Sequence, residues 1–164
     1  MAAGDDVARG TTADGDDVSG TSARQVILVR HAHADWPDYH GRDFDRPLTP
    51  RGEADATSTA RAILAAGLRP AILLASPALR TRQTAAIIAA ELGLPDAAIQ
   101  LVDSLYNASA DTLEAELRRA TATNEPVMLV AHNPGISELG RQMAKDPAFA
   151  HFSPADWRLL HQAP

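Results

Sequence analysis

Cysteine is absent from the 164-residue chain. Disulfide bonds, thiolate zinc sites and phosphatase chemistry with a cysteine nucleophile are therefore excluded, and the composition fits a reducing compartment. No apolar run approaches the length of a membrane-spanning helix, and the N-terminus lacks a basic region followed by an apolar segment. We therefore expect a cytoplasmic protein with no signal peptide and no membrane partner.

Positive charge is also scarce, because 15 Lys and Arg residues stand against 21 Asp and Glu residues, for a formal net charge of −6. Nucleic acids and anionic membrane surfaces attract proteins with a net positive field, so neither is expected as the main partner. The length suits one domain with a real core and is too short for two domains of ordinary size. No pattern in the sequence indicates an oligomeric state.

Residues 1–24 have no apolar periodicity and are rich in Gly, Asp, Ser, Thr and Ala. Within them Gly4-Asp5-Asp6-Val7 recurs as Gly15-Asp16-Asp17-Val18, which resembles low complexity. Such a segment buries too little apolar surface to offset the entropy of ordering it. We predict a disordered tail over residues 1–24 and a single domain over residues 25–164.

Aliphatic runs alternate with segments of helical periodicity along the rest of the chain. Three runs are expected as buried strands, 26–29, 71–75 and 126–131, and 99–102 is expected as a short strand. The first helix is expected from Pro50, after an N-cap at Thr49, to a stop at Gly67, and the second from Pro77, after an N-cap at Ser76, to Leu92. A third helix is expected from a capping box at 111–114 through Arg118, and a fourth from about Gly135 to Lys145. The alternation predicts a three-layer α/β/α domain with a mainly parallel central sheet.

Charged residues stand where the expected strands end. The first strand ends in Arg30 and His31, while Ser76, Arg80 and His132 follow other strands or lie in the first turns of the next helices. Ligands of open α/β sheets bind beyond the carboxyl ends of the strands, so these residues are expected in one crevice. Guanidinium groups and helix N-termini favour a phosphoryl group there. A neutral imidazole can attack phosphorus when a hydrogen bond fixes its tautomer.

Three separated motifs resemble those of the histidine phosphatase superfamily, which has the phosphoglycerate mutase-like fold. They are Arg30-His31-Ala32, Ser76-Pro77 with Arg80-Thr81 and Gln83-Thr84, and Val130-Ala131-His132-Asn133. The resemblance covers about residues 25–155. The shortness of the domain and two further stretches are similar to the SixA branch of phosphohistidine phosphatases: Asp45-Arg46-Pro47-Leu48-Thr49 with Arg51-Gly52, and Leu105-Tyr106-Asn107-Ala108.

The resemblance implies a catalytic role for four of these residues. His31 would attack phosphorus and become transiently phosphorylated, and water would then release phosphate. The equatorial oxygens would be clamped by Arg30, Arg80 and His132. Three further positions are expected to bind the substrate: Arg46, Ser76 and Asn133. No cofactor and no metal are expected, and the implied substrate is phosphohistidine in a protein, with a small phosphomonoester as the alternative.

This chain departs from the pattern of larger superfamily members at two places. Those members often carry a Glu that protonates the leaving group where this chain has 105–108, so N–P bonds or esters of acidic phenols are expected to be cleaved more readily than alkyl phosphates. Asp35 or Asp38 in the aperiodic loop 34–48, which is expected to lie over the crevice, could replace that acid. At the other end, Trp157–Leu160 is at most a stub, so the last strand of the sheet is expected to be missing or differently built.

Two other functions compete with this interpretation. His31, His33 and Asp35 match part of the metal-binding run of metallo-β-lactamase-like hydrolases, but a metal site would leave Arg30 and Arg80 unexplained. If the phosphatase interpretation holds, His33 lies at the rim of the site. A non-catalytic phosphate-binding module would keep the pocket but would not require the nucleophile. The remaining histidines are expected on the surface or in loops: His40, His151 and His161.

Overall fold

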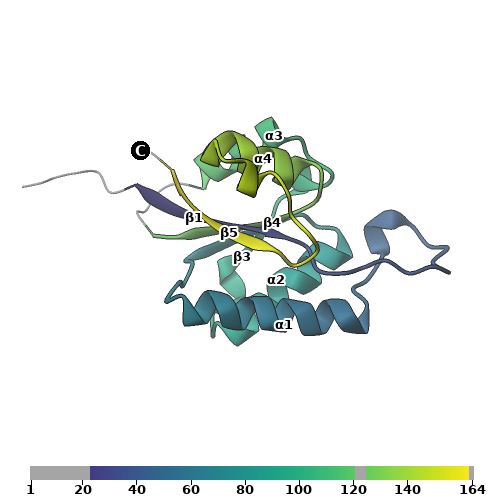
Figure 1. Cartoon of the computed structure of the whole chain (residues 1–164). Coiled ribbons are helices and arrows are strands. Elements are labelled where there is room, and N and C mark those ends of the chain that lie inside the picture. Colours follow the sequence, from purple (N-terminus) through teal and green to yellow (C-terminus); the bar gives the residue numbers. More distant parts are fainter. Residues whose placement is uncertain (1–22, 121–124, 163–164) are drawn as a thin grey trace, which may run out of the picture.

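A computed structural model describes residues 23–120 and 125–162, which form a five-stranded sheet covered by helices on both faces (Figure 1). The strand order is β3-β2-β4-β1-β5, and every neighbouring pair is parallel except β1 and β5. The strands are β1 (Arg24–Arg30), β2 (Ile72–Ala75), β3 (Ile99–Leu101), β4 (Val127–Ala131) and β5 (Trp157–Gln162). The predicted three-layer α/β/α fold is therefore confirmed.

Helices α1 (Pro50–Ala65) and α2 (Leu79–Glu91) cover one face of the sheet, and α3 (Ala110–Arg119) and α4 (Gly135–Ala144) cover the other (Figure 1). Alternate side chains of β1 pack on the two faces, since Ile27 belongs to the core beneath α1 and α2 while Leu28 belongs to the core beneath α3 and α4. Both are fully buried, which explains why this strand is aliphatic without alternation. Four short 3-10 helices complete the fold: η1 (Asp43–Asp45), η2 (Asp96–Ala98), η3 (Asp103–Leu105) and η4 (Pro147–Phe149).

The helix starts differ from the sequence predictions in two places. At α1 the prediction is confirmed, because the Thr49 hydroxyl accepts the Gly52 N–H at 3.1 Å and Pro50 begins the helix. At α2 the prediction is wrong, because the helix begins at Leu79 and Ser76 is not its N-cap. At α3 the cap is Ser109 in place of the predicted capping box, and the helix begins at Ala110. In each case the actual boundary lies within two residues of the expected one.

The C-terminal segment forms a complete edge strand. The six residues of β5 pair antiparallel with β1, in a register that places Leu160 opposite Val26 and Trp157 opposite Val29. The last strand is therefore present, and it runs two residues beyond the stub, Trp157–Leu160, that was expected from the sequence. The predicted disordered tail lies outside the described residues apart from its last two residues, and of these Arg24 begins β1 and donates to the Leu117 carbonyl oxygen at 2.9 Å.

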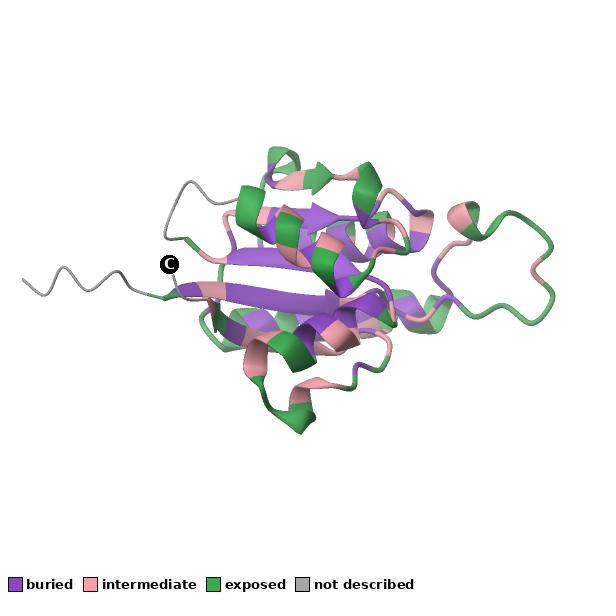
Figure 2. Ribbon diagram, turned by 90° about the horizontal axis from the view of Figure 1, so that it is seen from above, coloured by how far each residue is buried: buried purple, intermediate pink, exposed green. Residues whose placement is uncertain are grey.

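Residues 35–47, called the arm below, project beyond the carboxyl edge of the sheet, and most of the arm is exposed (Figure 2). Hydrogen bonds within the arm shape it, among them those from Trp36 Nε1 to the Pro47 carbonyl oxygen at 2.9 Å and from the Tyr39 hydroxyl to the Arg42 carbonyl oxygen at 2.8 Å. Only the base of the arm borders the crevice that it was expected to cover. Within residues 23–120 and 125–162, none of the helices combines the length and the apolar character that a membrane crossing would need.

Candidate active site

The parallel strands β1, β2 and β4 are neighbours and end at one edge of the sheet, so the residues that follow them meet there. A cavity of about 620 Å³ opens at this edge. It is lined by all four residues predicted to be catalytic and by two of the three predicted to bind substrate: Arg30, His31, Arg80, His132, Arg46 and Asn133. The third, Ser76, is fully buried behind the cavity wall.

His31 is held as a neutral imidazole with one nitrogen left for chemistry. Its Nδ1 lies 2.8 Å from the Ala32 carbonyl oxygen, which can only accept, so Nδ1 carries the proton. His31 is 8% exposed, and burial, reinforced by the charges of Arg80 and Arg30, lowers its pKa to about 4 despite the bond to Ala32. At neutral pH the Nε2 lone pair is therefore free of a proton, as a nucleophile requires.

His132 lies beside His31, with 5.3 Å between the ring centroids. Its Nδ1 is 3.2 Å from Arg80 Nη2, and because a guanidinium can only donate, this nitrogen is an acceptor and the proton is on Nε2. Nε2 in turn lies 2.8 Å from the Ser76 hydroxyl oxygen. Burial, followed by the influence of His31 and Arg80, lowers the pKa of His132 to about 3.

The burial of Ser76 corrects its predicted role. Its hydroxyl oxygen accepts the Ala78 N–H at 3.2 Å and contacts His132, so it is engaged with the protein and does not face the cavity. Ser76 therefore orients the His132 ring and does not line the cavity. Sequence spacing placed it correctly at the end of β2 but could not show which way its hydroxyl points.

Arg30 and Asn133 share an anchor on the chain that leads into β5. Arg30 Nη1 donates to the Phe152 carbonyl oxygen at 2.9 Å, and Asn133 Nδ2 donates to the same oxygen at 3.0 Å. The Nε atoms of Arg30 and Arg80 are buried and have no hydrogen-bond partner among the described residues. Cationic donors with spare capacity around one cavity favour an anionic guest.

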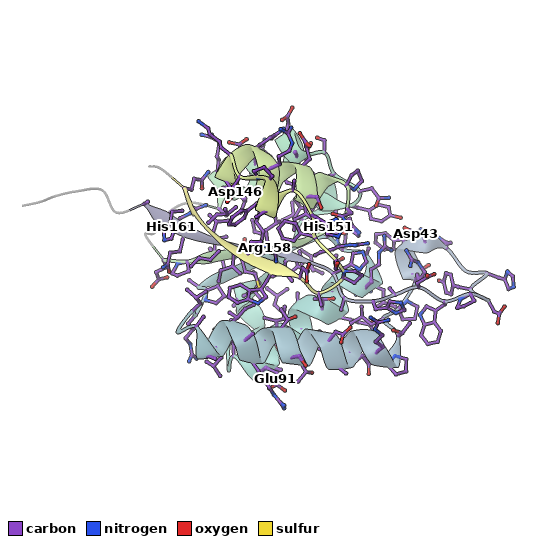
Figure 3. All side chains as sticks on the ribbon, viewed as in Figure 1. Asp43, Glu91, Asp146, His151, Arg158 and His161 are labelled. Atoms are coloured by element: carbon purple, nitrogen blue, oxygen red, sulfur yellow. The ribbon has the colours of Figure 1, made fainter. Side chains whose placement is uncertain are left out.

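Asp43 is the main residue of the site that sequence reasoning missed. Its Oδ2 accepts from Arg80 Nη2 at 3.0 Å and from the Tyr106 hydroxyl at 2.7 Å, while its Oδ1 accepts from Arg46 Nη2 at 2.9 Å. Its own backbone carbonyl oxygen accepts from Arg80 Nη1 at 2.8 Å. Asp43 therefore connects the base of the arm to the floor of the cavity, and Figure 3 shows it where the arm meets the domain.

The environment of Asp43 keeps it ionised. Burial alone would raise the pKa of this carboxyl group, but the hydrogen bonds from Tyr106 and Arg46 and the charge of Arg80 outweigh burial and hold the pKa well below its usual range. A carboxylate in this state does not donate a proton. The sequence offered no signal that singles out Asp43, because the arm also carries Asp35, Asp38 and Asp45.

The two acids considered from the sequence lie in different places. Asp35 lines the cavity and is exposed, whereas Asp38 lies in a separate hollow with Trp36 and Tyr39 on the arm. His33 also lines the cavity, with its Nδ1 2.8 Å from the Thr49 hydroxyl, as expected of a rim residue. The histidines expected on the surface are all exposed: His40, His151 and His161. Figure 3 shows His151 and His161 away from Asp43.

The metal-binding alternative has no matching geometry in the part of the chain that the structure describes. In residues 23–120 and 125–162, no three His, Cys, Asp or Glu side chains are grouped so that they could hold a metal ion. The arrangement is that of an anion site built from side-chain cations.

Comparison with known proteins agrees with this geometry. The sequence model of the histidine phosphatase superfamily (branch 1) matches residues 26–139. The chain belongs to this superfamily. An uncharacterised chloroplastic protein of Arabidopsis thaliana is 35% identical over 130 residues, which are 74% of this chain and 60% of that protein. The chain thus spans less than two thirds of that relative.

Two solved structures extend the similarity to the fold. The candidate phosphohistidine phosphatase SixA of Agrobacterium tumefaciens superimposes with a TM-score of 0.76 at 30% identity, over 85% of this chain and 93% of that one. The candidate SixA of Nakamurella multipartitia gives a TM-score of 0.67 at 32% identity, over 84% and 83% of the two chains. The identification of a SixA-type histidine phosphatase from the sequence motifs is confirmed.

Proposed function

We propose that the protein is a phosphatase that uses His31 as its nucleophile and acts on phosphohistidine in another protein. The observation that carries the proposal is the His31 ring itself, which is tautomerically fixed by the Ala32 carbonyl oxygen and lines a cavity shared with three arginines. The similarity to the two SixA structures supports the same reaction class.

In the first step His31 Nε2 forms a bond to phosphorus as the bond from phosphorus to the leaving group breaks. Arg30 and Arg80 balance the charge on the phosphoryl oxygens, where phosphoryl-transfer enzymes have most to stabilise. His132 is neutral and its Nδ1 is an acceptor, so it binds the phosphoryl group by accepting the O–H of a protonated phosphoryl oxygen, while Arg30 and Arg80 donate to the other oxygens. In the second step water attacks phosphorus, and inorganic phosphate and free His31 result.

The substrate class follows from the state of the acids at the cavity. Asp43 is ionised and engaged by cations, so it does not supply a proton to a departing alkoxide. A positioned general acid is typically worth about 10²–10⁴ in rate, and a substrate with a poor leaving group would lose that factor here. Imidazole leaves more readily than an alkoxide, so a phosphohistidine depends less on such an acid.

The nucleophile is tested by trapping the intermediate. The protein is incubated with a phosphodonor and quenched in base, because phosphohistidine is labile in acid, and the modified residue is located by mass spectrometry. We expect phosphorus on His31 and none on the His31→Ala protein. Label on another residue, or none on a protein that turns over, would contradict the mechanism.

The substrate class is tested by comparing kcat/KM for a phosphohistidine peptide, an aryl phosphate and an alkyl phosphate such as a sugar phosphate. We expect the order phosphohistidine, aryl, alkyl, with the peptide ahead of the alkyl ester by at least about 10². A preference for the alkyl ester would favour the alternative, a small-molecule phosphomonoesterase, and would identify a working acid. Asp35→Asn is the variant that would then locate it, since Asp35 is the other carboxylate lining the cavity.

A further inference from the structure

Asp43 stands at the mouth of the cavity, in front of the residues that form its floor. The side chain of Asp43 is 50% exposed, whereas the Arg80 side chain to which it is bonded is 4% exposed. His132 and His31 are also buried. The floor therefore receives the phosphoryl group, and a group attached to the phosphoryl must extend past Asp43 toward solvent.

The in-line geometry of phosphoryl transfer also places the leaving group near Asp43. Nucleophile and leaving group lie roughly in line on opposite sides of phosphorus during phosphoryl transfer. Because His31 attacks from the floor, the leaving group departs outward, on the side of the exposed residues that line the cavity. Among the exposed residues that line the cavity, Asp43 is hydrogen-bonded to Arg80. Since Arg80 is proposed to bind the phosphoryl oxygens, Asp43 lies next to them.

The charge of Asp43 is thus placed where it meets the leaving group. Its carboxylate accepts three hydrogen bonds, two at Oδ2 and one at Oδ1, and a carboxylate has room for about four. One position on Oδ1 is therefore left for a donor from outside the protein. A neutral imidazole or an amide N–H could occupy it, while a carboxylate or a second phosphate on the leaving group would be repelled.

We propose that Asp43 determines specificity by rejecting leaving groups that carry negative charge and by accepting a hydrogen bond from those that carry an N–H. The inference rests on the proposed function, because it concerns the leaving group of the same reaction. It supplies a second reason, independent of the missing acid, why anionic alkyl phosphates such as phosphoglycerates are poor substrates and phosphohistidine is a good one.

A matched pair of aryl phosphates isolates this effect from the chemistry. 4-Carboxyphenyl phosphate and 4-carbamoylphenyl phosphate have nearly the same shape, but only the first carries a negatively charged substituent on its leaving group. Their intrinsic reactivities differ by a constant factor that cancels when the ratio of their kcat/KM values is compared between proteins. A general weakening of the site, such as misplacement of Arg80, would lower both values and leave the ratio unchanged.

The variant is Asp43→Asn, which keeps the shape and one acceptor oxygen, replaces the other oxygen by an amide NH2 and removes the charge. We expect the carboxy-to-carbamoyl ratio to rise by about fivefold, the size of the repulsion between two unit charges about 4 Å apart in water. The control is Asp45→Asn, which removes the same charge from the same turn. Asp45 is paired with Arg42 at 3.8 Å and does not line the cavity, so its ratio should stay within twofold.

Two further measurements keep the proposal testable if Asp43→Asn misfolds. In the unmodified protein the ratio should rise with ionic strength, because salt screens repulsion at an exposed site. Tyr106→Phe removes a donor to Asp43 but keeps its charge, so the ratio should not change. An unchanged ratio in Asp43→Asn, an equal rise in Asp45→Asn, or a ratio insensitive to salt would each overturn the proposal.

The outcome is separable from that of the proposed function. If phosphohistidine peptides are not preferred but the aryl ratio responds to Asp43→Asn, the substrate assignment fails while the role of Asp43 holds. If the peptides are preferred and the ratio does not respond, the reverse is true.

Discussion

The floor of the cavity and the base of the arm each contribute an arginine and its partner to the lining of one cavity, but they hold these residues differently. On the floor, Arg80 and His132 are each 3% exposed and follow strands or begin helices that are packed in the core. On the arm, the side chains of Arg46 and Asp43 are 25% and 50% exposed and are held by each other and by the floor.

This difference separates chemistry from recognition. A buried guanidinium or imidazole interacts strongly with charge because the dielectric around it is low, and it is already in place when the reaction occurs. Such groups suit the transfer of the phosphoryl group, which is common to every substrate. An exposed segment held by a few polar contacts can vary without disturbing the core, so it suits the part of the substrate that varies. Substitutions on the floor should therefore reduce turnover, and those on the arm should change affinity and preference.

The largest effect is expected for His31→Ala, because this substitution removes the nitrogen that forms the bond to phosphorus. Turnover should fall to background, by at least about 10³, with the far-ultraviolet circular dichroism unchanged. His151→Ala, an exposed histidine outside the cavity, is the control and should be fully active. Near-normal turnover by a folded His31→Ala protein would end the nucleophile assignment.

Arg80→Ala and His132→Ala should each lower kcat by about 10² or more, on the scale of losing one transition-state oxyanion donor. The two residues are bonded to each other at 3.2 Å, so the double variant should lose less than the product of the two single effects. Single effects of tenfold or less would show that the clamp is wrongly assigned.

Ser76→Ala tests how far the floor depends on residues that never meet the substrate. Removing the hydroxyl leaves His132 Nε2 without its partner, and a typical net hydrogen bond of about 1 kcal/mol corresponds to about fivefold. We expect kcat to fall by about fivefold to tenfold with KM nearly unchanged. A rise in KM alone would instead return Ser76 to the substrate-binding role predicted from the sequence.

Arg46→Ala tests the arm with a smaller expected effect. Arg46 divides its donors between Asp43 and the Ala34 carbonyl oxygen and is partly exposed, so its loss should raise KM by about threefold to tenfold and change kcat less. Arg42→Ala is the matched control, because Arg42 is exposed on the arm and does not line the cavity. A loss in kcat equal to that of Arg80→Ala would contradict the prediction that residues of the floor affect turnover and residues of the arm affect affinity.

The two buried histidines should also make stability depend on pH. Their pKa values are about 4 and about 3 in the folded protein against 6.5 when exposed, so the unfolded chain binds more protons between these limits. The free energy of unfolding should therefore fall as the pH is lowered from about 6.5 toward 4, and level off above 7. Denaturant titrations at several pH values measure the slope of the free energy of unfolding against pH, which gives the number of protons taken up on unfolding. His132→Gln should reduce this number by about one. An equal slope in both proteins would contradict the buried neutral ring.

Most of the floor was predictable because its signals are local. An aliphatic run that ends in Arg30 and His31, and another that ends in His132, place these residues at strand ends by the residue pattern alone. The parallel alternation of strands and helices then brings the ends to one edge. Helix starts were less reliable, as at Ser76, because the direction of a single hydroxyl depends on the His132 ring 56 residues away.

The arm was not predictable in the same way. Its four aspartates look alike in sequence, and the one that joins the site is selected by contact with Tyr106, 63 residues away, and with Arg80, 37 residues away. The edge strand β5 is a similar case, because its short aliphatic pattern gains a strand partner only when it lies against β1.

By itself, then, the sequence determined which arginine and histidine side chains meet at the cavity, since backbone hydrogen bonding and aliphatic burial force strand ends to a common edge wherever such runs alternate with helices. Only the tertiary structure decided the tautomers of His31 and His132, the buried role of Ser76 and the choice of Asp43. Each of these is set by a hydrogen bond whose partner is a particular atom, and for all but the His31 tautomer that atom belongs to a segment far away in the chain.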